Sequence, residues 1–382
     1  MTRDFHAELK AWSGIKHKIL GQYLSLFLGK LGGLGKHVHY IDGFAGQGRY
    51  ETGEKGSPLI AAELAENPPQ NSRRGVLRCI NVEASKSVFA NLEEATKEYV
   101  AKGVVKNHNK EFEEILPVIL QQIGDDPALF FIDPFGTEGA EVSTLATIAK
   151  RKGITEVLVR FDDTRVHRLI QWTRSNLESL DAKHRKTAEA FLSRIANLTD
   201  ASAIEAVVAR SEDPRQALID GYENLVKSLK LFTYSLSYPI RNPDTGGHHY
   251  FLVHFCNFPD GYTHMANFMA KVERTWRSYA HGQKELLPAK APQMEMLAIN
   301  QEVADQVEKK HVQTLVNSLQ QTFILRGFHK NAVECRRVYA AIVDEFGWKY
   351  TRKEWIKALR ELESDGILTM SGSDDKNTIT MY

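Results

Sequence analysis

Residues 40–50, YIDGFAGQGRY, decide the fold. A short apolar segment that begins at Val38 ends here in Asp42, and the glycine-rich turn 42–48 follows. An acid and a glycine-rich turn after a buried strand are typical of nucleotide-binding loops in α/β folds. Glycine suits such a loop because it takes positive φ and lets the backbone approach a ligand closely. We therefore expect a ligand-binding turn here, and a turn without a ligand is the alternative.

The spacing of the glycines differs from that of two common nucleotide-binding loops. Gly43, Gly46 and Gly48 form G-x-x-G-x-G, which differs from the G-x-G-x-x-G of dinucleotide-binding folds. No G-K-[ST] follows, so the sequence does not predict a P-loop that binds ATP. The spacing alone does not identify the cofactor.

The composition predicts a folded protein of several domains. The chain has 382 residues, 42% of them hydrophobic, and its 49 Lys and Arg nearly balance its 48 Asp and Glu. At about 100 to 200 residues per domain, this length suggests about two or three domains. The apolar fraction excludes an intrinsically disordered chain. The balanced charge argues against a uniformly basic nucleic-acid-binding protein but allows a local basic face.

The sequence shows no signal that would take the protein out of the cytoplasm. No run reaches the ~20 apolar residues of a membrane span, and residues 1–15 lack the apolar core of a signal peptide. Cys79, Cys256 and Cys335 lie far apart and form no C-x-x-C pair, so neither a disulfide framework nor a cysteine-rich zinc site is expected. We expect a cytoplasmic protein that does not bind a membrane.

Apolar strand patterns alternate with helical patterns from residue 38 to residue 161, which predicts a parallel sheet with helices on both faces. Two later strand patterns flank the turn-rich NPDTGG (242–247) and predict an antiparallel pair. By analogy, this order predicts the seven-stranded, Rossmann-like α/β sheet of class I methyltransferases. The expected strands are 38–41, 77–82, 103–107, 128–132, 156–161, 231–240 and 249–258.

The other segments predict further domains. A polar, helical composition over 164–229 indicates a helical insertion into a methyltransferase-like domain that spans 1–163 and 230–283. A proline-containing connector is expected at 284–310. The tail, 311–382, has the helix, helix and two-stranded wing of a winged helix, and a capping box, Thr351 to Glu354, begins its second helix.

Acidic residues follow the second and third strands. Glu83 ends the second strand, where α/β folds place the carboxylate that accepts the hydroxyls of a ribose. Asn109 and Glu111 follow the third strand and are candidates for contact with an adenine. For all three residues, a solvated strand end is the alternative.

Asp133, Pro134, Phe135 and Gly136 follow the buried fourth strand. A carboxylate in such a place costs stability unless it has partners. Asp133 and the Pro134 carbonyl together can accept both hydrogens of an exocyclic amine, and Phe135 can stack on a flipped or unpaired base. The alternative is that Asp133 caps the next helix and Phe135 packs in the core.

Basic residues gather in two places. Arg160, Arg165 and Arg168, at the end of the fifth strand, are candidates for binding substrate phosphates, and a solvated helix start is the alternative. Residues 271–277 have a base at every third position, which indicates either a nucleic-acid or partner-binding stripe or a charged helical face. No metal site is expected, because the spacing of the histidines matches no common zinc pattern. These histidines are His248, His249, His254 and His264.

Several blocks of sequence together resemble the three-Cys-motif partner family (TcmP). They are KHKILGQYL (16–24), YIDGFAGQGRY (40–50), GSPLIAAEL (56–64), NVEAS (81–85), FFIDPFG (130–136) and HHYFLVHFCNFPDGYTHM (248–265). The family name refers to a separate radical-SAM-like protein, which the resemblance implies as a partner. The C-terminal winged-helix outline also agrees with this family.

The family is similar to class I methyltransferases, so the resemblance implies S-adenosylmethionine as the cofactor. Its expected binding residues are Asp42, Gly43, Phe44, Ala45, Gly46, Gly48 and Glu83, with Asn109 and Glu111 as further candidates. D-P-F-G departs from the D/N-P-P-Y/F of nucleic-acid amino-methyltransferases but resembles the motif of tRNA guanine-N2 dimethyltransferases. Both groups of enzymes act on exocyclic amines.

The leading hypothesis is therefore a methyltransferase that acts on a nucleobase amine in DNA or RNA. Asp133, Pro134 and Phe135 are its expected catalytic residues, and the C-terminal domain would help to bind nucleic acid. The alternative is a non-catalytic scaffold that holds the three-Cys-motif protein or nucleic acid. Methylation of a protein or a small molecule is a third possibility.

Overall fold

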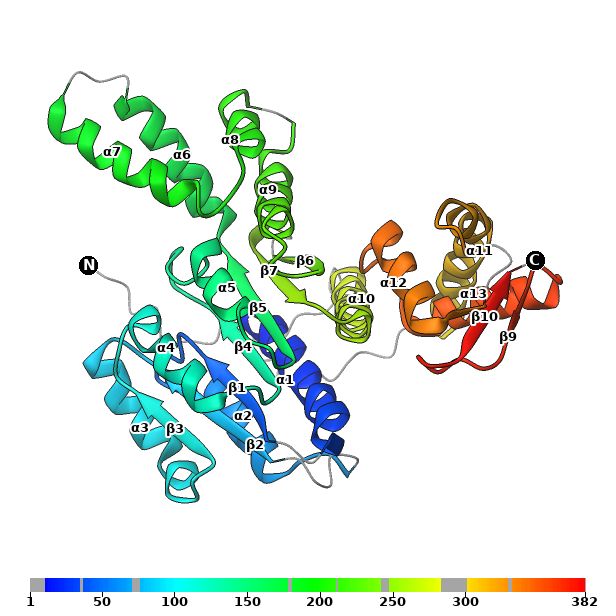
Figure 1. The fold of residues 1–382 in the computed structure, drawn as a ribbon, viewed down its shortest axis with the longest axis horizontal. Helices are drawn as coiled ribbons and strands as arrows, with labels where there is room; N and C mark the ends of the chain where they lie inside the picture. The colour runs from blue at the N-terminus through cyan, green and yellow to red at the C-terminus, as the bar shows by residue number, and fades with distance from the viewer. Residues whose placement is uncertain are drawn as a thin grey trace. The chain divides into compact units, whose positions relative to one another are not determined.

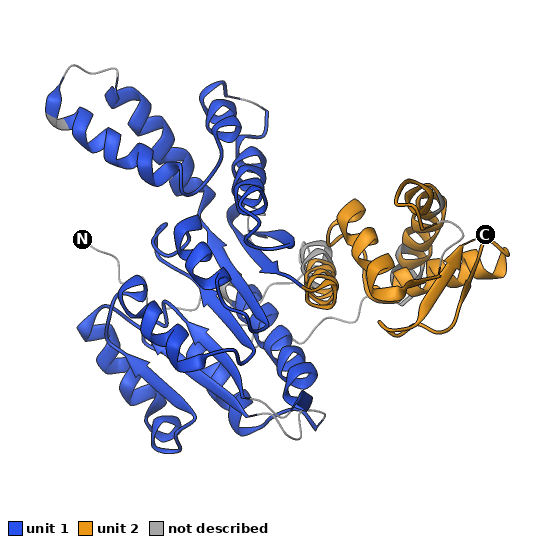
Figure 2. Ribbon diagram, in the orientation of Figure 1, with its two compact units in different colours: residues 1–242, 247–257 blue, residues 243–246, 258–382 orange. Residues whose placement is uncertain are grey.

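A computed structural model describes residues 11–34, 37–70, 76–177, 181–210, 212–241, 247–282, 301–328 and 332–381. The chain forms two compact units, which comprise residues 1–242 and 247–257 in the first and residues 243–246 and 258–382 in the second (Figure 2). The domain boundaries expected from the sequence separate parts of the chain that would fold independently. The division into two units does not test independent folding. None of the described helices combines the length and the apolar character that a membrane span requires.

The first unit is built on a seven-stranded sheet with the order β3-β2-β1-β4-β5-β7-β6 (Figure 1). The strands β1 to β5 pair in parallel, and β7 pairs antiparallel with both β5 and β6. The predicted α/β, Rossmann-like sheet is thereby confirmed. The strands are β1 (Val38–Asp42), β2 (Leu77–Val82), β3 (Val105–His108), β4 (Ala128–Ile132), β5 (Thr155–Phe161), β6 (Tyr234–Arg241) and β7 (His248–Cys256).

Helices cover both faces of this sheet. Alternation along β4 divides its side chains, so that Phe130 and Ile132 join one apolar core while Phe131 points to the other face. The core around Phe130 is closed by α4 (Phe112–Ile123), α5 (Val142–Ala149), α6 (Asp163–Leu177) and α9 (Pro214–Ser228). The helices α1 (Ala11–Leu31), α2 (Ser57–Glu66) and α3 (Lys86–Ala101) pack with one another and on β1, β2 and β3.

The predicted insertion between β5 and β6 is helical. It consists of α6, α7 (Ala182–Ile195), α8 (Ala201–Val208) and α9. The helix α9 packs on β6 and α8 packs on α9, whereas α6 and α7 form a pair that extends away from the sheet (Figure 1). Consequently α6 begins at the carboxyl edge of the sheet and leads outward from it.

The second unit contains helices and a small antiparallel sheet. Its helices are α10 (Pro259–Gly282), α11 (Gln301–Leu325), α12 (Cys335–Phe346) and α13 (Arg352–Ser364). Its three-stranded sheet has the order β8-β10-β9, with β8 (Ala332–Glu334), β9 (Leu368–Met370) and β10 (Thr378–Met381). The predicted helices and hairpin are therefore present, and the identification as a winged helix stays a prediction.

Two features of this unit differ from the sequence analysis. The expected connector, 284–310, is helical from Gln301 onward, and its earlier part lies outside the described residues. The reason is that α11 continues through Val312, Leu315 and Leu319, whose side chains are buried on one face. Strand β8 was not expected, because three residues are too few to show a strand pattern.

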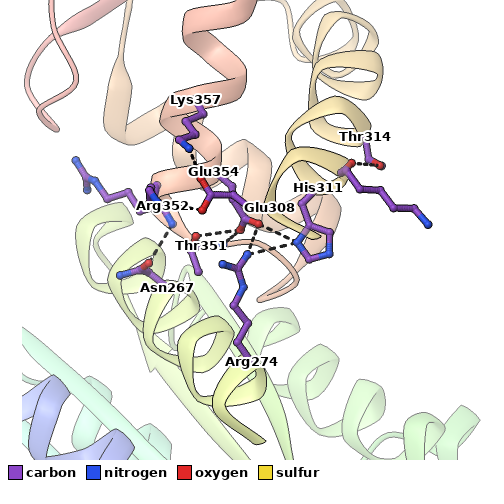
Figure 3. Close-up of polar contacts among 11 residues, drawn as sticks. Asn267, Arg274, Glu308, His311, Thr314, Thr351, Arg352, Glu354 and Lys357 are labelled. Atoms are coloured by element: carbon purple, nitrogen blue, oxygen red, sulfur yellow. Dashed lines mark hydrogen bonds and ion pairs between the residues drawn. The ribbon is translucent and has the colours of Figure 1, made fainter. Parts of the chain in front are cut away.

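A buried carboxylate joins three helices of the second unit (Figure 3). Glu354 of α13 has no exposed surface, and its Oε2 accepts hydrogen bonds from the Thr351 N–H at 2.7 Å and the Thr351 Oγ1 at 2.9 Å. Its Oε1 pairs with Arg274 of α10 and lies 2.8 Å from His311 Nδ1 of α11. The predicted capping box is thus confirmed, and it also fixes α10 and α11 to the start of α13.

We expect Glu354→Ala to lower the free energy of unfolding of the second unit by about 3 kcal/mol. The substitution removes a helix cap and leaves Arg274 without its partner carboxylate. Glu361→Ala, at an exposed position of the same helix, is the matched control and should change the stability by less than about 0.5 kcal/mol. Urea unfolding followed by tryptophan fluorescence, to which the buried Trp355 of this unit contributes, measures both values. Equal stability of the two variants would contradict this account.

Candidate functional site

The turn after β1 is fixed at both ends by backbone hydrogen bonds. The Gly43 N–H donates to the Phe131 carbonyl of β4 at 2.9 Å, and the Ala45 N–H donates to the Val82 carbonyl of β2 at 2.9 Å. Gly46 and Gly48 have φ of +65° and +78°, so the turn requires the conformational freedom predicted for them. Apart from its chain neighbours, no described residue has an atom within 4 Å of the position that a Cβ would take at Gly46, so Gly46 faces open space within the described part of the chain.

Asp42 lies beneath the turn and has no exposed surface. Its Oδ2 accepts a hydrogen bond from the Tyr40 hydroxyl at 3.0 Å, and its Oδ1 accepts one from the Phe44 N–H at 3.3 Å. Burial raises the pKa of Asp42 from its ordinary 3.8 to about 6, and the charge of Asp133 also raises it, against hydrogen bonds from Ser57 and Tyr40. The Asp42 side chain therefore stabilises the turn by accepting a hydrogen bond from the backbone of Phe44.

Glu83 connects the ends of β1 and β2. Its Oε2 accepts a hydrogen bond from the Gly46 N–H at 3.0 Å, and its Oε1 accepts one from the Ser85 N–H at 2.8 Å. The side-chain amide of Asn109 donates to the carbonyls of Glu83 and Ala84 at 2.8 and 3.0 Å. The structure thus places Glu83 and Asn109 at the turn, with Asn109 as a support of the Glu83 backbone.

Two other predicted cofactor residues have different surroundings. Glu111 is the N-cap residue of α4, is exposed, and makes no side-chain capping bond. The ring of Phe44 packs against Phe112 of α4, with the ring centroids 5.8 Å apart. Phe44 thereby anchors the turn to the core.

The loop after β4 carries the predicted catalytic residues. Asp133 Oδ2 is paired with the ammonium group of Lys16 from α1, and its Oδ1 is buried without a hydrogen-bond donor in the described part of the chain. The Pro134 carbonyl accepts a hydrogen bond from Arg160 Nη1 at 3.0 Å, and Phe135 is 50% exposed. The loop therefore presents three groups: the Asp133 carboxylate oriented by Lys16, the Pro134 carbonyl with one of its two lone pairs in use, and the accessible ring of Phe135.

Lys16 was not predicted as a site residue. It is 6% exposed, and its ammonium group lies 5.7 Å from the centroid of the Phe131 ring. Burial and the charge of Lys16 together lower the pKa of the neighbouring His17 to about 3, so this imidazole is neutral at pH 7. A lysine on the apolar face of the first helix was the signal available in the sequence, since Ile19 and Leu20 follow it by one turn.

Tyr250 of β7 is the second residue that the sequence did not predict. The guanidinium of Arg160 stacks on its ring at 4.5 Å from the centroid. Its hydroxyl is buried without a hydrogen-bond partner among the described residues, and burial followed by the charge of Asp133 raises its pKa. The phenol is therefore a protonated donor beside the Asp133 loop.

The three predicted phosphate-binding arginines lie in different environments. Arg160 is engaged with Pro134, with Tyr250 and, at 3.4 Å from Nη2, with Asp162 Oδ2. Arg165 on α6 pairs with Asp162 but remains exposed. Arg168, one turn further along α6, is exposed as well.

The histidines named above and the stripe at 271–277 include side chains that contact a carboxylate. His248 Nε2 lies 2.8 Å from Asp163 Oδ1, and His254 Nε2 lies 2.8 Å from Glu156 Oε2. Arg274 pairs with Glu354 in the second unit. The side chain of Arg277 lies outside the described residues, so the stripe at 271–277 stays a prediction.

The raised pKa of Asp42 predicts how stability depends on pH. The unfolded carboxyl titrates near 3.8 and the folded one near 6, so the folded state binds the proton more tightly and loses stability as the pH rises through this range. At about 1.4 kcal/mol per pKa unit, the ionised form costs the folded state about 3 kcal/mol at pH 7. We expect the stability of wild type relative to Asp42→Asn to fall by about this amount between pH 4 and pH 7 in urea unfolding. A difference that is independent of pH would show that the folded carboxyl titrates normally.

The chain is only distantly similar to known proteins. No family model matches the chain, and no curated protein matches its sequence. The O-methyltransferase TomG from Streptomyces achromogenes, solved in complex with SAM, is 13% identical, with 66% of this chain and 92% of that chain covered and a TM-score of 0.31. An O-methyltransferase from Bacillus cereus in complex with SAH is 13% identical (66% and 84% covered, TM-score 0.34). Protein LPL1258 from Legionella pneumophila is 14% identical (72% and 94% covered, TM-score 0.36).

Proposed function

We propose that the protein is an S-adenosylmethionine-dependent methyltransferase that acts on an exocyclic amine of a nucleobase in DNA or RNA. The observation that carries the proposal is the turn after β1, in which Gly46 takes a positive φ, faces open space and is held by Glu83 from the next strand. This combination leaves room for a ligand at the carboxyl edge of a parallel sheet, where such folds bind nucleotides.

The residues around the turn fit a nucleoside cofactor. Gly46 would let the cofactor approach the backbone, and the carboxylate of Glu83 has acceptor sites left for ribose hydroxyls beside its two N–H partners. When bound, S-adenosylmethionine supplies a methyl group that the lone pair of an amine attacks directly, and the amine loses its proton afterwards. The chain has to position the amine and exclude competing geometries, which needs little general-base catalysis.

The loop after β4 fits an amine substrate. Asp133 Oδ1 accepts no hydrogen bond within the described part of the chain, although Arg160 Nη1 lies 3.9 Å from it. The Pro134 carbonyl has one lone pair left beside its bond from Arg160. An exocyclic amine has two hydrogens to donate, one to each of these oxygens. Lys16 orients Asp133 from the opposite side, and the exposed ring of Phe135 offers a stacking surface for the base.

One observation favours the non-catalytic alternative, in which the fold binds nucleic acid or a three-Cys-motif protein without methylating it. Both acceptors of the Asp133 loop already have cationic partners, Lys16 and Arg160. An amine would therefore have to bind beside these cations. The two experiments below separate the alternatives.

We expect wild type to bind S-adenosylmethionine in a calorimetric titration and Gly46→Trp to abolish this binding, because the indole would fill the space that the glycine leaves open. Gly124→Trp is the matched control, since Gly124 also has a positive φ and an open Cβ position but lies at the end of α4, away from the turn. Absence of binding by wild type at about millimolar ligand, a weak affinity of about 4 kcal/mol, would reject the cofactor.

We expect Asp133→Asn to keep cofactor binding and to slow methyl transfer by about a hundredfold, because the amide presents a donor or a weaker acceptor to the amine. The measurement is transfer of tritium from labelled S-adenosylmethionine to total RNA and heat-denatured DNA. Asp126→Asn, at the opposite end of β4, should transfer label like wild type.

Equal transfer by Asp133→Asn and wild type would contradict the assigned role of Asp133. Cofactor binding without transfer to either pool would favour the binding-only alternative.

A further inference from the structure

The surface of α6 is basic. Within Asp163–Leu177 the only acid is Asp163, which has no exposed surface and lies 2.8 Å from His248 Nε2 and 3.7 Å from Arg215 Nε. The helix also carries Arg165, Arg168 and Arg174. The helix itself therefore contributes no exposed carboxylate, although the whole chain has a net charge of only +1. The exposed carboxylate of Glu138, in the loop after β4, lies near Arg165 at the start of the helix.

Two of these arginines and a tryptophan share one face. Arg165, Arg168 and Trp172 are spaced by three and four residues, which places them along one side of a helix. The side chain of Arg165 is 57% exposed and Trp172 is 38% exposed. Arg168 is exposed and has no ion-pair partner among the residues that the structure describes. Phe191 of α7 contacts the Trp172 ring edge-on, with the centroids 5.3 Å apart, and so holds it in place.

This face begins at the Asp133 loop. The Arg165 N–H donates to Asp162 Oδ1 at 3.0 Å, which fixes the start of α6 beside the end of β5. Arg165 Nη1 lies 3.5 Å from the position that a Cβ would take at Gly136. From there α6 extends away from the sheet, so the face leads outward from the site (Figure 1).

We propose that this face of α6 binds single-stranded nucleic acid. Arginines neutralise backbone phosphates, and an exposed aromatic ring offers a stacking surface that any base can use. The bases of a duplex are stacked on each other, whereas an unpaired base is free to stack on Trp172 while another base of the same strand reaches Phe135. That a base is methylated at Asp133 rests on the proposed function, whereas strand binding by α6 does not.

The test is fluorescence anisotropy of a labelled single-stranded DNA 20-mer of mixed sequence, with the same 20-mer as a duplex for comparison. We expect the single strand to bind more tightly, Trp172→Ala to weaken it about tenfold, and Trp172→Phe to weaken it less because stacking is retained. Arg168→Ala should lower the slope of log K against log salt by about 0.7, the value for one phosphate contact of a single strand. Lys152→Ala, which removes an exposed cation before β5, is the matched control and should bind like wild type.

Three results would overturn the proposal: tighter binding of the duplex, wild-type affinity in both Trp172→Ala and Arg168→Ala, or no binding of the single strand at low salt. Urea unfolding of each variant separates lost binding from lost stability, with Trp172→Phe as the milder change. Calorimetric binding of S-adenosylhomocysteine to the same proteins tests the cofactor site separately. Strand binding without cofactor binding would therefore reject the methyltransferase and support the α6 surface. Cofactor binding without strand binding would reject the α6 surface and leave the methyltransferase proposal in place.

Discussion

Two acids at neighbouring strand ends impose the main constraint on this protein. The strands β1 and β4 lie side by side and run in parallel, so Asp42 and Asp133 follow them at the same edge of the sheet. Burial raises the pKa of Asp42, and the negative charge of Asp133 raises it further. Lys16 pairs with Asp133 and supplies the compensating charge. The first helix is therefore part of the site as well as a cover for the sheet.

The two acids have different surroundings, which suits different tasks. Asp42 is bonded by the turn that it supports and is enclosed by Tyr40 and Phe44. Asp133 keeps one oxygen without a donor in the described residues, beside the exposed ring of Phe135. A buried carboxylate without a donor costs stability, so its persistence is physically reasonable where a ligand supplies the missing hydrogen bond. The proposed cofactor and amine sites are thus neighbours because their strands are neighbours.

The sequence predicted the sheet well because its signals are local. Buried strands of this kind are apolar runs, and β2 and β4 have the predicted bounds. The acids were also predictable, since an acid directly after an apolar strand is visible without knowing what it contacts. Lys16 and Tyr250 were not found, because each meets Asp133 or its loop across more than a hundred residues of chain. For Arg160 the sequence indicated phosphate binding, whereas its observed partners, Pro134 and Tyr250, make it a support of the loop.

A crystal structure with S-adenosylhomocysteine bound tests the central claim most directly. The account predicts the ligand at the turn after β1, with its ribose hydroxyls within about 3.2 Å of the Glu83 carboxylate and its sulfur directed toward Asp133. A ligand bound elsewhere, or a ribose that does not contact Glu83, would contradict the assignment of the site.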